Sequence, residues 1–213
     1  HRTETLRVDP SGLVNPEDLK AALTDQGGLV SVMHSNNEVG SIQPIAKLAK
    51  LAHDAGFLMH TDAAQSVGKT PIKVDDLGVD LLSIAGHKLY APKGIGALYV
   101  RKDTPIGPVH LGAGHEAGIR PGTEPVALIV GLGEACAIAE REGLERSARL
   151  ERLRDKLHQA LKDQIPGLRL HGHPVHRLPN TLNIGFPGIS GTRLLDHCPE
   201  LLDAHVEGVP TLA

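Results

Sequence analysis

Apolar and polar positions along the N-terminal half of the chain predict strands separated by helices. Four near-continuous apolar runs are typical of buried strands: residues 29–33, 57–60, 79–84 and 95–100. Between the first two runs, residues 44–55 carry apolar side chains at helical spacing and end at Gly56. This strand–helix–strand order predicts an α/β fold in which helices cover a parallel sheet.

Shorter or later patterns complete the predicted elements. Asn15, Pro16 and the acids after them predict a helix that runs to about Thr24, and residues 75–78 predict a turn. Helical periodicity then continues with few breaks over residues 126–164, with bends expected at its glycines. Two short strands and a final helix are predicted at residues 168–171, 181–186 and 192–197.

The composition places the chain among ordinary globular proteins. Its 213 residues are 40% hydrophobic and 22% charged, which suffices for one large or two small domains. The formal net charge of -3 gives no argument for nucleic acid or an anionic membrane as a partner, and no apolar run approaches the length of a membrane span. Residues 1–5 carry neither an initiator Met nor a signal-peptide pattern, so we expect the chain to come from the middle of a protein.

The cysteine and histidine residues agree with an ordinary globular protein and do not point to a disulfide or a metal site. Cys136 and Cys198 fall in helix-patterned segments, so we expect small buried apolar side chains, no disulfide, and a reducing, cytoplasmic setting. His171 and His173 stand close together, but no third ligand follows at a metal-site spacing. A surface loop is therefore expected there, and no metal.

The candidate chemistry lies at the ends of predicted strands. Lys88 follows the run that ends at residue 84, and a lysine held near apolar walls at such a place suits a nucleophile that forms a Schiff base. Asp62 follows the run that ends at residue 60, and its carboxylate can hold a pyridinium nitrogen. With Asn37, these residues are expected to meet at the carboxyl edge of the sheet. Taken singly, a lysine at such a place is usually a solvated turn lysine.

Four motifs, in this order, resemble the cysteine desulfurase and selenocysteine lyase family: residues 34–40 (HSNNEVG), 60–69 (HTDAAQSVGK), 86–88 (GHK), and 112–116 with 120–123 (GAGHE and RPGT). That family comprises pyridoxal-phosphate enzymes of the aspartate-aminotransferase fold (fold-type I), in the class V aminotransferase branch. The resemblance continues through residues 177–181 (RLPNT). It implies part of the large, cofactor-binding α/β domain over residues 1–140. A linking helix and part of a small α+β domain would occupy residues 141–213.

The resemblance implies a catalytic role for Lys88, which would form the Schiff base with pyridoxal phosphate and then move protons. Asp62 would pair with the pyridine nitrogen and keep it protonated. Gln65 would donate a hydrogen bond to the ring hydroxyl oxygen. Apart from the resemblance, Asp62 is equally suited to capping the next helix, and Gln65 to an exposed surface position.

Three further residues complete the implied cofactor site. His87 resembles a phosphate ligand, and Asn37 resembles a residue that touches the cofactor and the substrate carboxylate. Thr123 resembles a hydroxyl that reaches the phosphate of the neighbouring subunit's cofactor, which implies a homodimer. The alternatives are a turn asparagine for Asn37 and the N-cap of the long helix for Thr123. His115 and Arg120, on the same loop as Thr123, are given no catalytic step.

Departures from the family pattern bear on activity. Ala85 stands where desulfurases commonly carry a phosphate-binding Ser, although selenocysteine lyases also lack it, and Ala117 stands where many relatives have Arg. Cys198 falls too early, in a helical context, to be the family's nucleophilic Cys, and no Ser-Gly-Ala-Cys-like segment follows it. The phosphate-cradling loop, the ring-stacking His and the C-terminal Arg also have no counterpart. The chain is therefore expected to be truncated and inactive.

The implied activity converts L-cysteine to L-alanine and leaves the sulfur on an enzyme cysteine as a persulfide. Such sulfur passes to an acceptor protein, as in iron–sulfur cluster assembly. The sequence does not choose between L-cysteine and L-selenocysteine as the substrate. Two alternatives stay open: another fold-type I aminotransferase or lyase, and a non-catalytic scaffold fragment.

Overall fold

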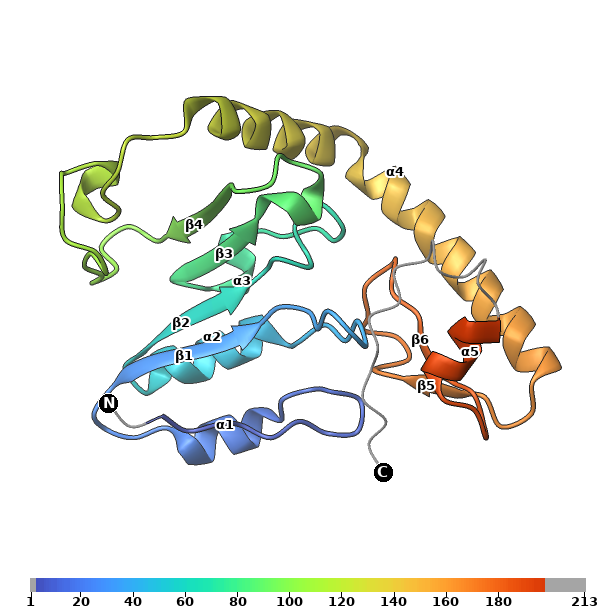
Figure 1. Ribbon diagram of the computed structural model, residues 1–213. Coiled ribbons are helices and arrows are strands. Elements are labelled where there is room, and N and C mark those ends of the chain that lie inside the picture. Colours follow the sequence, from blue (N-terminus) through green and yellow to red (C-terminus); the bar gives the residue numbers. More distant parts are fainter. Residues whose placement is uncertain (1–2, 198–213) are drawn as a thin grey trace.

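The computed structural model describes residues 3–197 of the chain (Figure 1). Its main sheet contains β1 (Gly28–Met33), β2 (Phe57–Asp62), β3 (Leu81–Ala85) and β4 (Gly96–Val100), in that spatial order. The first three strands are parallel, and β4 runs antiparallel to β3. The expected α/β fold with a mostly parallel sheet is confirmed.

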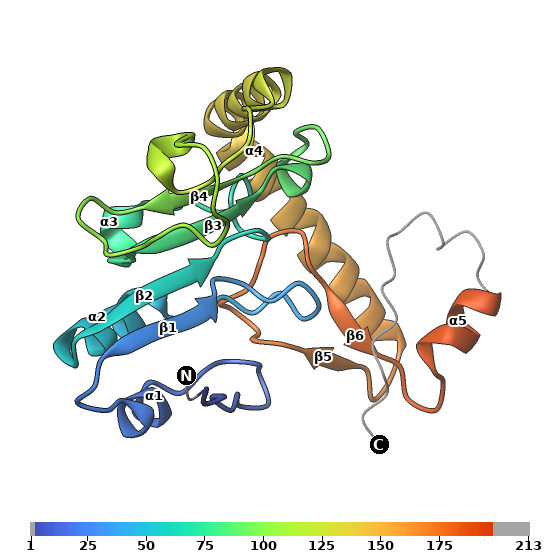
Figure 2. The ribbon, with the colours of Figure 1, turned by 60° about the vertical axis from the view of Figure 1, so that its left-hand side comes forward.

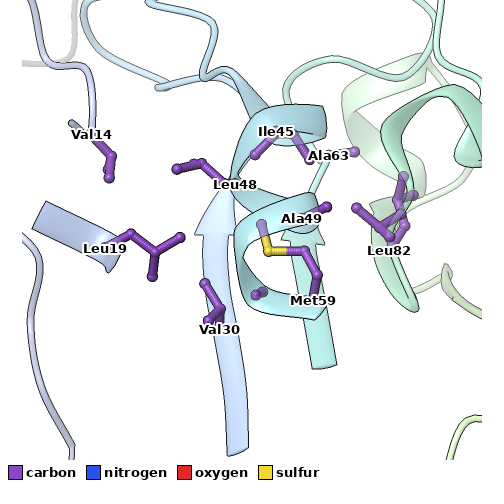
Figure 3. Packing of buried hydrophobic residues seen from close by; sticks show 11 residues of the cluster. Val14, Leu19, Val30, Ile45, Leu48, Ala49, Met59, Ala63 and Leu82 are labelled. Atoms are coloured by element: carbon purple, nitrogen blue, oxygen red, sulfur yellow. The ribbon is translucent and has the colours of Figure 1, made fainter. Parts of the chain in front are cut away.

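Three helices build the core against one face of this sheet: α1 (Pro16–Ala22), α2 (Ile45–Asp54) and α3 (Val74–Leu77). α2 is amphipathic, because its buried residues recur at helical spacing from Ile45 to Leu48, Ala49 and Ala52. Their side chains pack against strand residues such as Met59 of β2 (Figure 3). Leu48, Ala52 and Met59 are fully buried, so this contact forms the centre of the main core.

Residues on the opposite face of the sheet are more exposed. Because side chains alternate along a strand, the neighbours of buried Met59 and Thr61 in β2 project away from α2. That face carries Leu29 and Leu98, which are 55% and 50% exposed. His60 and Asp62 belong to the same face, so the polar residues at the end of β2 lie outside the helix-covered core.

A 39-residue helix, α4 (Val126–Gln164), spans the molecule from the main sheet to a second, smaller lobe (Figures 1 and 2). Near its start, Leu132 and Ala135 pack against Leu89 and Ala91, which follow β3. The second lobe contains α5 (Gly191–His197) and a two-stranded antiparallel sheet of β5 (Arg169–His171) and β6 (Asn183–Gly185). The predicted domain boundary after residue 140 falls inside α4, and it stays a prediction.

Several expectations about local structure are wrong. Residues 75–78 do not form a simple turn, because α3 occupies Val74–Leu77 and Gly78 ends it with a left-handed φ of 66°. Cys136 is exposed, because only the stripe of α4 that includes Leu132 and Ala135 is covered. By contrast, the bends expected in α4 are compatible with the structure, since α4 is one continuous helix whose axis bends along its length (Figure 1). Cys198 lies outside the described residues.

Two further features of the described part of the chain bear on its class. Within residues 3–197, no helix is both long and apolar enough to cross a membrane. In the same range, no group of three His, Cys, Asp or Glu residues could hold a metal ion. His171 instead bonds through Nδ1 to Asn183 Oδ1 at 3.0 Å, and His173 Nδ1 accepts the backbone N–H groups of Val175 and His176. Both histidines therefore stabilise local structure.

We predict that Leu48→Ala lowers the free energy of unfolding by about 2–5 kcal/mol, because it leaves a cavity between α2 and the sheet. The exposed neighbour Lys47 serves as the control, and Lys47→Ala should change stability by less than about 0.5 kcal/mol. Denaturant unfolding followed by circular dichroism measures both. Equal losses in the two variants would contradict this assignment of the core.

Candidate cofactor site

The C-terminal ends of β1, β2 and β3 reach the same edge of the sheet (Figure 2). Three segments follow the strands at this edge: the loop of residues 34–43, the turn of residues 63–70, and the 3-10 helix η1 (Gly86–Leu89). In open α/β sheets, this edge is where ligands bind. Each of these segments carries residues that the sequence singles out.

Asp62 is the last residue of β2, and its side chain is half-buried. Its Oδ1 accepts the backbone N–H of Ala64 at 2.8 Å and thereby starts the turn of residues 63–70. The capping alternative considered for this residue thus has a counterpart in the structure. The second carboxylate oxygen takes no part in that hydrogen bond, so a capping role and a ligand-binding role are compatible.

His60, two residues before Asp62, bridges the three parallel strands. Its Nδ1 lies 2.8 Å from Ser31 Oγ on β1, and its Nε2 lies 2.9 Å from Ser83 Oγ on β3. Burial lowers the pKa of His60, and the negative charge of Asp62 partly opposes that shift. This bridge fixes the face of the sheet from which Asp62 projects, and the sequence reasoning missed it.

Gln65 and Lys69 lie on the turn that follows β2. Lys69 Nζ donates a hydrogen bond to Gln65 Oε1 at 3.1 Å. Burial, and then the positive charge of Lys88, lower the pKa of Lys69. The structure therefore places Gln65 in hydrogen-bond contact with Lys69. It also places Lys69 close enough to Lys88 for the two positive charges to repel each other. Sequence reasoning overlooked Lys69, although its position four residues after Gln65 was the available signal.

Hydrogen bonds from β1-side residues and from α4 hold the turn of residues 63–70 on two sides. His34 Nδ1 lies 2.8 Å from Ser66 Oγ, and the hydroxyls of Ser35 and Ser66 are also hydrogen-bonded. On the other side, Ser147 Oγ of α4 donates to the backbone oxygen of Lys69 at 2.6 Å. Burial lowers the pKa of His34. The turn thus has little freedom to move relative to β1 and α4.

Lys88 lies within η1, three residues beyond the end of β3, and its side chain is half-buried, whereas His87 is exposed. The backbone N–H of Gly86 donates to Ile95 O at 3.0 Å. A Cβ at Gly86 would lie only 2.7 Å from that same oxygen, so the close approach requires glycine. This close backbone contact fixes how the chain leaves β3, and therefore where the backbone of Lys88 lies in η1.

Asn37 and Thr123 are exposed and have fewer local constraints. The turn after β1 is closed by Asn36, whose Oδ1 accepts the N–H groups of Glu38 and Val39 at 2.9 Å each. Asn37 lies in this turn, as its alternative expected, but the side chain that closes the turn is that of Asn36. The helix-cap alternative for Thr123 is wrong, because Pro125 is the N-cap of α4. No contact that the structure describes joins Thr123 to the residues at the sheet edge.

The groups at this edge fit the aldehyde and the ring nitrogen of a pyridine aldehyde. Lys88 supplies an amine, Asp62 a carboxylate, and Gln65 an amide whose oxygen is already bound by an ammonium group. That last hydrogen bond leaves the amide NH2 of Gln65 as the donor for a ligand. Two hollows in the surface, one between α1 and α2 and one beside Pro44 at the end of the loop of residues 34–43, are not lined by Lys88, Asp62 or Gln65. The site is therefore defined by its chemistry and by the strand ends.

Solved structures define the class of fold. A structure named "NIFS-LIKE PROTEIN" superposes with a TM-score of 0.86 at 38% identity, covering 92% of this chain and 54% of that chain. DndA from Streptomyces lividans superposes with a TM-score of 0.79 at 37% identity, covering 91% of this chain and 55% of that chain. The fold is that of the NifS-like proteins of fold-type I.

The chain belongs to the aminotransferase class-V family, because residues 2–206 match the family described as "Aminotransferase class-V". It is 46% identical to "Cysteine desulfurase IscS" of Dictyoglomus turgidum, over 90% of this chain and 49% of the relative. It is 41% identical to "Cysteine desulfurase" of Homo sapiens, over 89% of this chain and 42% of the relative. The chain thus spans about half the length of these relatives or less. Pyridoxal phosphate is the cofactor of this family.

We predict that stability falls in acid partly because of His34. Its pKa in the folded state lies below the unfolded value of about 6.5, so its contribution to stability is complete above about pH 6.5. The contribution is lost as the pH falls through the folded-state pKa. His34→Asn retains an amide that can bond Ser66 and cannot titrate. Its melting temperature should therefore fall less than that of the wild type between about pH 8 and about pH 5. Parallel curves for the two proteins would contradict this.

Proposed function

We propose that these residues belong to a pyridoxal-phosphate-dependent cysteine desulfurase. Such an enzyme converts L-cysteine to L-alanine and transfers the sulfur to an enzyme cysteine as a persulfide. The observation that carries the proposal is the placement of Lys88 and Asp62 at the same ends of the adjacent parallel strands β3 and β2. The names of the relatives support the choice of L-cysteine as the substrate.

Each residue at the sheet edge has a task in this proposal. Pyridoxal phosphate, when bound, supplies an electron-withdrawing ring that stabilises negative charge on the substrate α-carbon. Lys88 Nζ would hold the cofactor through its aldehyde and would move the proton of the substrate α-carbon. The Asp62 carboxylate keeps a proton on the pyridine nitrogen. Gln65 orients the ring through its amide NH2.

The remaining residues bind the ends of the cofactor and substrate. We assign His87 to the phosphate, and Asn37 to the cofactor and the substrate carboxylate. Thr123 is assigned to the phosphate of the cofactor in a second subunit, which makes the active form a homodimer. The exposure of His87, Asn37 and Thr123 leaves their side chains free to meet a ligand or a neighbouring subunit. The persulfide would pass to a sulfur-acceptor protein, and Cys198 is not proposed as the sulfur-accepting cysteine.

Alternative substrates and roles follow from the same site. L-selenocysteine would fit the same chemistry, since selenium replaces sulfur on the β-carbon, next to the α-carbon that loses its proton. A scaffold protein would not turn over, so sulfide release from L-cysteine with dithiothreitol separates that alternative from an enzyme. The relatives include a "Probable cysteine desulfurase, mitochondrial" of Dictyostelium discoideum, and the cytoplasmic location expected from the cysteine content stays a prediction.

We predict that Lys88→Ala in the full-length protein abolishes the absorbance band at about 400 nm that pyridoxal phosphate gives when bound to a lysine. Turnover should fall by about 100-fold or more, because the amine also moves protons. Lys93→Ala, at an exposed lysine on the loop before β4, is the matched control and should retain the band. A band that persists in Lys88→Ala would show that the cofactor is held elsewhere.

We predict that Asp62→Asn retains the cofactor but lowers turnover by about 100-fold or more, since the ring nitrogen loses the charge that keeps it protonated. Asn can still accept the N–H of Ala64, so the fold should be little affected. If Asp62 served only as a cap, the variant would keep both its stability and its turnover, because Asn caps about as well as Asp. Melting temperature and turnover, measured on the same samples, distinguish these results.

A further inference from the structure

The hydrogen bond between Lys69 and Gln65 determines which way the Gln65 amide faces. Lys69 Nζ lies 3.1 Å from the side-chain oxygen of Gln65. An ammonium group has only donors, so its partner on the amide is the oxygen and not the nitrogen. The NH2 group of Gln65 must then point away from Lys69. The orientation of this amide follows from chemistry and does not depend on how its two ends were assigned.

Two effects disfavour a charged Lys69 side chain at its position beside Gln65. Its side chain is partly buried, and the charge of Lys88 is close enough to act on it. Desolvation and a like charge both disfavour an ammonium group. A lysine that served only to cover the surface would gain nothing by lying beside a second lysine.

The backbone of Lys69 is also held from outside its own turn. Ser147 Oγ donates to Lys69 O at 2.6 Å, and Arg146 Nη2 donates to Gly68 O at 3.1 Å. Both donors come from α4, 78 residues further along the chain. With its main chain fixed by α4, the Lys69 side chain reaches back over one turn to Gln65 from a defined position.

We propose that Lys69 is a positioning residue for the cofactor, which acts by holding Gln65 with its NH2 group directed to the oxygen of the cofactor ring. This inference rests on the proposed function, because it assumes that Gln65 meets pyridoxal phosphate. It adds a residue to which neither the motif resemblance nor the relatives assign a task. Lys69 itself touches neither cofactor nor substrate in this proposal.

Cofactor affinity tests the proposal without relying on turnover. Pyridoxal phosphate is titrated into the full-length apoprotein, and its dissociation constant is obtained from the absorbance band at about 400 nm. Lys69→Met should weaken binding by about 3- to 10-fold, the effect of one misplaced hydrogen bond. Lys69→Arg, which still donates to the Gln65 oxygen, should restore affinity to within about 2-fold of the wild type. The exposed Lys47→Met is the control and should bind as the wild type does.

A double variant shows whether Lys69 acts through Gln65. Gln65→Ala should weaken binding by about as much as Lys69→Met, and adding Lys69→Met to it should change affinity by less than about 2-fold. Gln65→Glu can retain the bond to Lys69 and has no NH2, so it should bind at least as weakly as Gln65→Ala. This variant provides a test even if Lys69→Met does not fold.

Three results would overturn the inference. Wild-type affinity in Lys69→Met or in Gln65→Glu would show that the amide orientation is irrelevant. Fully multiplicative losses in the double variant would show that Lys69 acts without Gln65. A wild-type protein that gives no Lys88-dependent band would refute the proposed function, and this inference with it. A Lys88-dependent band with unchanged affinity in Lys69→Met refutes the inference alone.

Discussion

Parallel pairing of β1, β2 and β3 is the constraint on which the site depends, since it delivers three loops from distant parts of the sequence to one edge. The register aligns Met33 with Asp62 and Asp62 with Ser83. Because side chains alternate along a strand, a slip of one residue in β2 would turn Asp62 toward the helix-covered core. The His60 bridge to Ser31 and Ser83 secures this register from the polar face, while Met59 secures it from the core face.

The second lobe supports the loop that follows β1. The backbone of Ile42 donates to His176 O, and that of Leu178 donates to Gly40 O. Gly40 has a left-handed φ of 77°, and a Cβ there would lie 2.8 Å from Thr181, so this contact also requires glycine. Asn37 lies within this loop. Its position therefore depends on segments that the chain reaches only after α4, which makes α4 part of the architecture of the site.

Charged groups join α4 to the second lobe. Arg154 of α4 is buried and donates to Leu178 O at 2.7 Å, and Asp155 binds both Arg154 and Arg177. Burial, followed by the charge of Arg154, lowers the pKa of Arg177. Within residues 3–197, Nε and Nη1 of Arg177 are buried without a hydrogen-bond partner. Removing Asp155 would take away the ion pair that the structure describes for buried Arg177, whereas Arg154 would keep its pair with Glu151.

Elements with a strong hydrophobic period could be predicted from the sequence, and side-chain partnerships could not. The period of α2 follows from Ile45 and Leu48, and the apolar runs located the strands within a few residues. The exposure of Cys136 depends on which stripe of α4 is covered, and the capping of α4 by Pro125 depends on the path of the preceding loop. Lys69 and His60 stand in recognisable motifs, but their partners become visible only when turns and strands are placed in space.

The most direct test of the role of Lys88 is to reduce the pyridoxal-phosphate-loaded, full-length protein with borohydride and map the modified peptide by mass spectrometry. A pyridoxyl group is expected on Lys88, and a label on Lys69 or Lys93 instead would contradict the role assigned to Lys88.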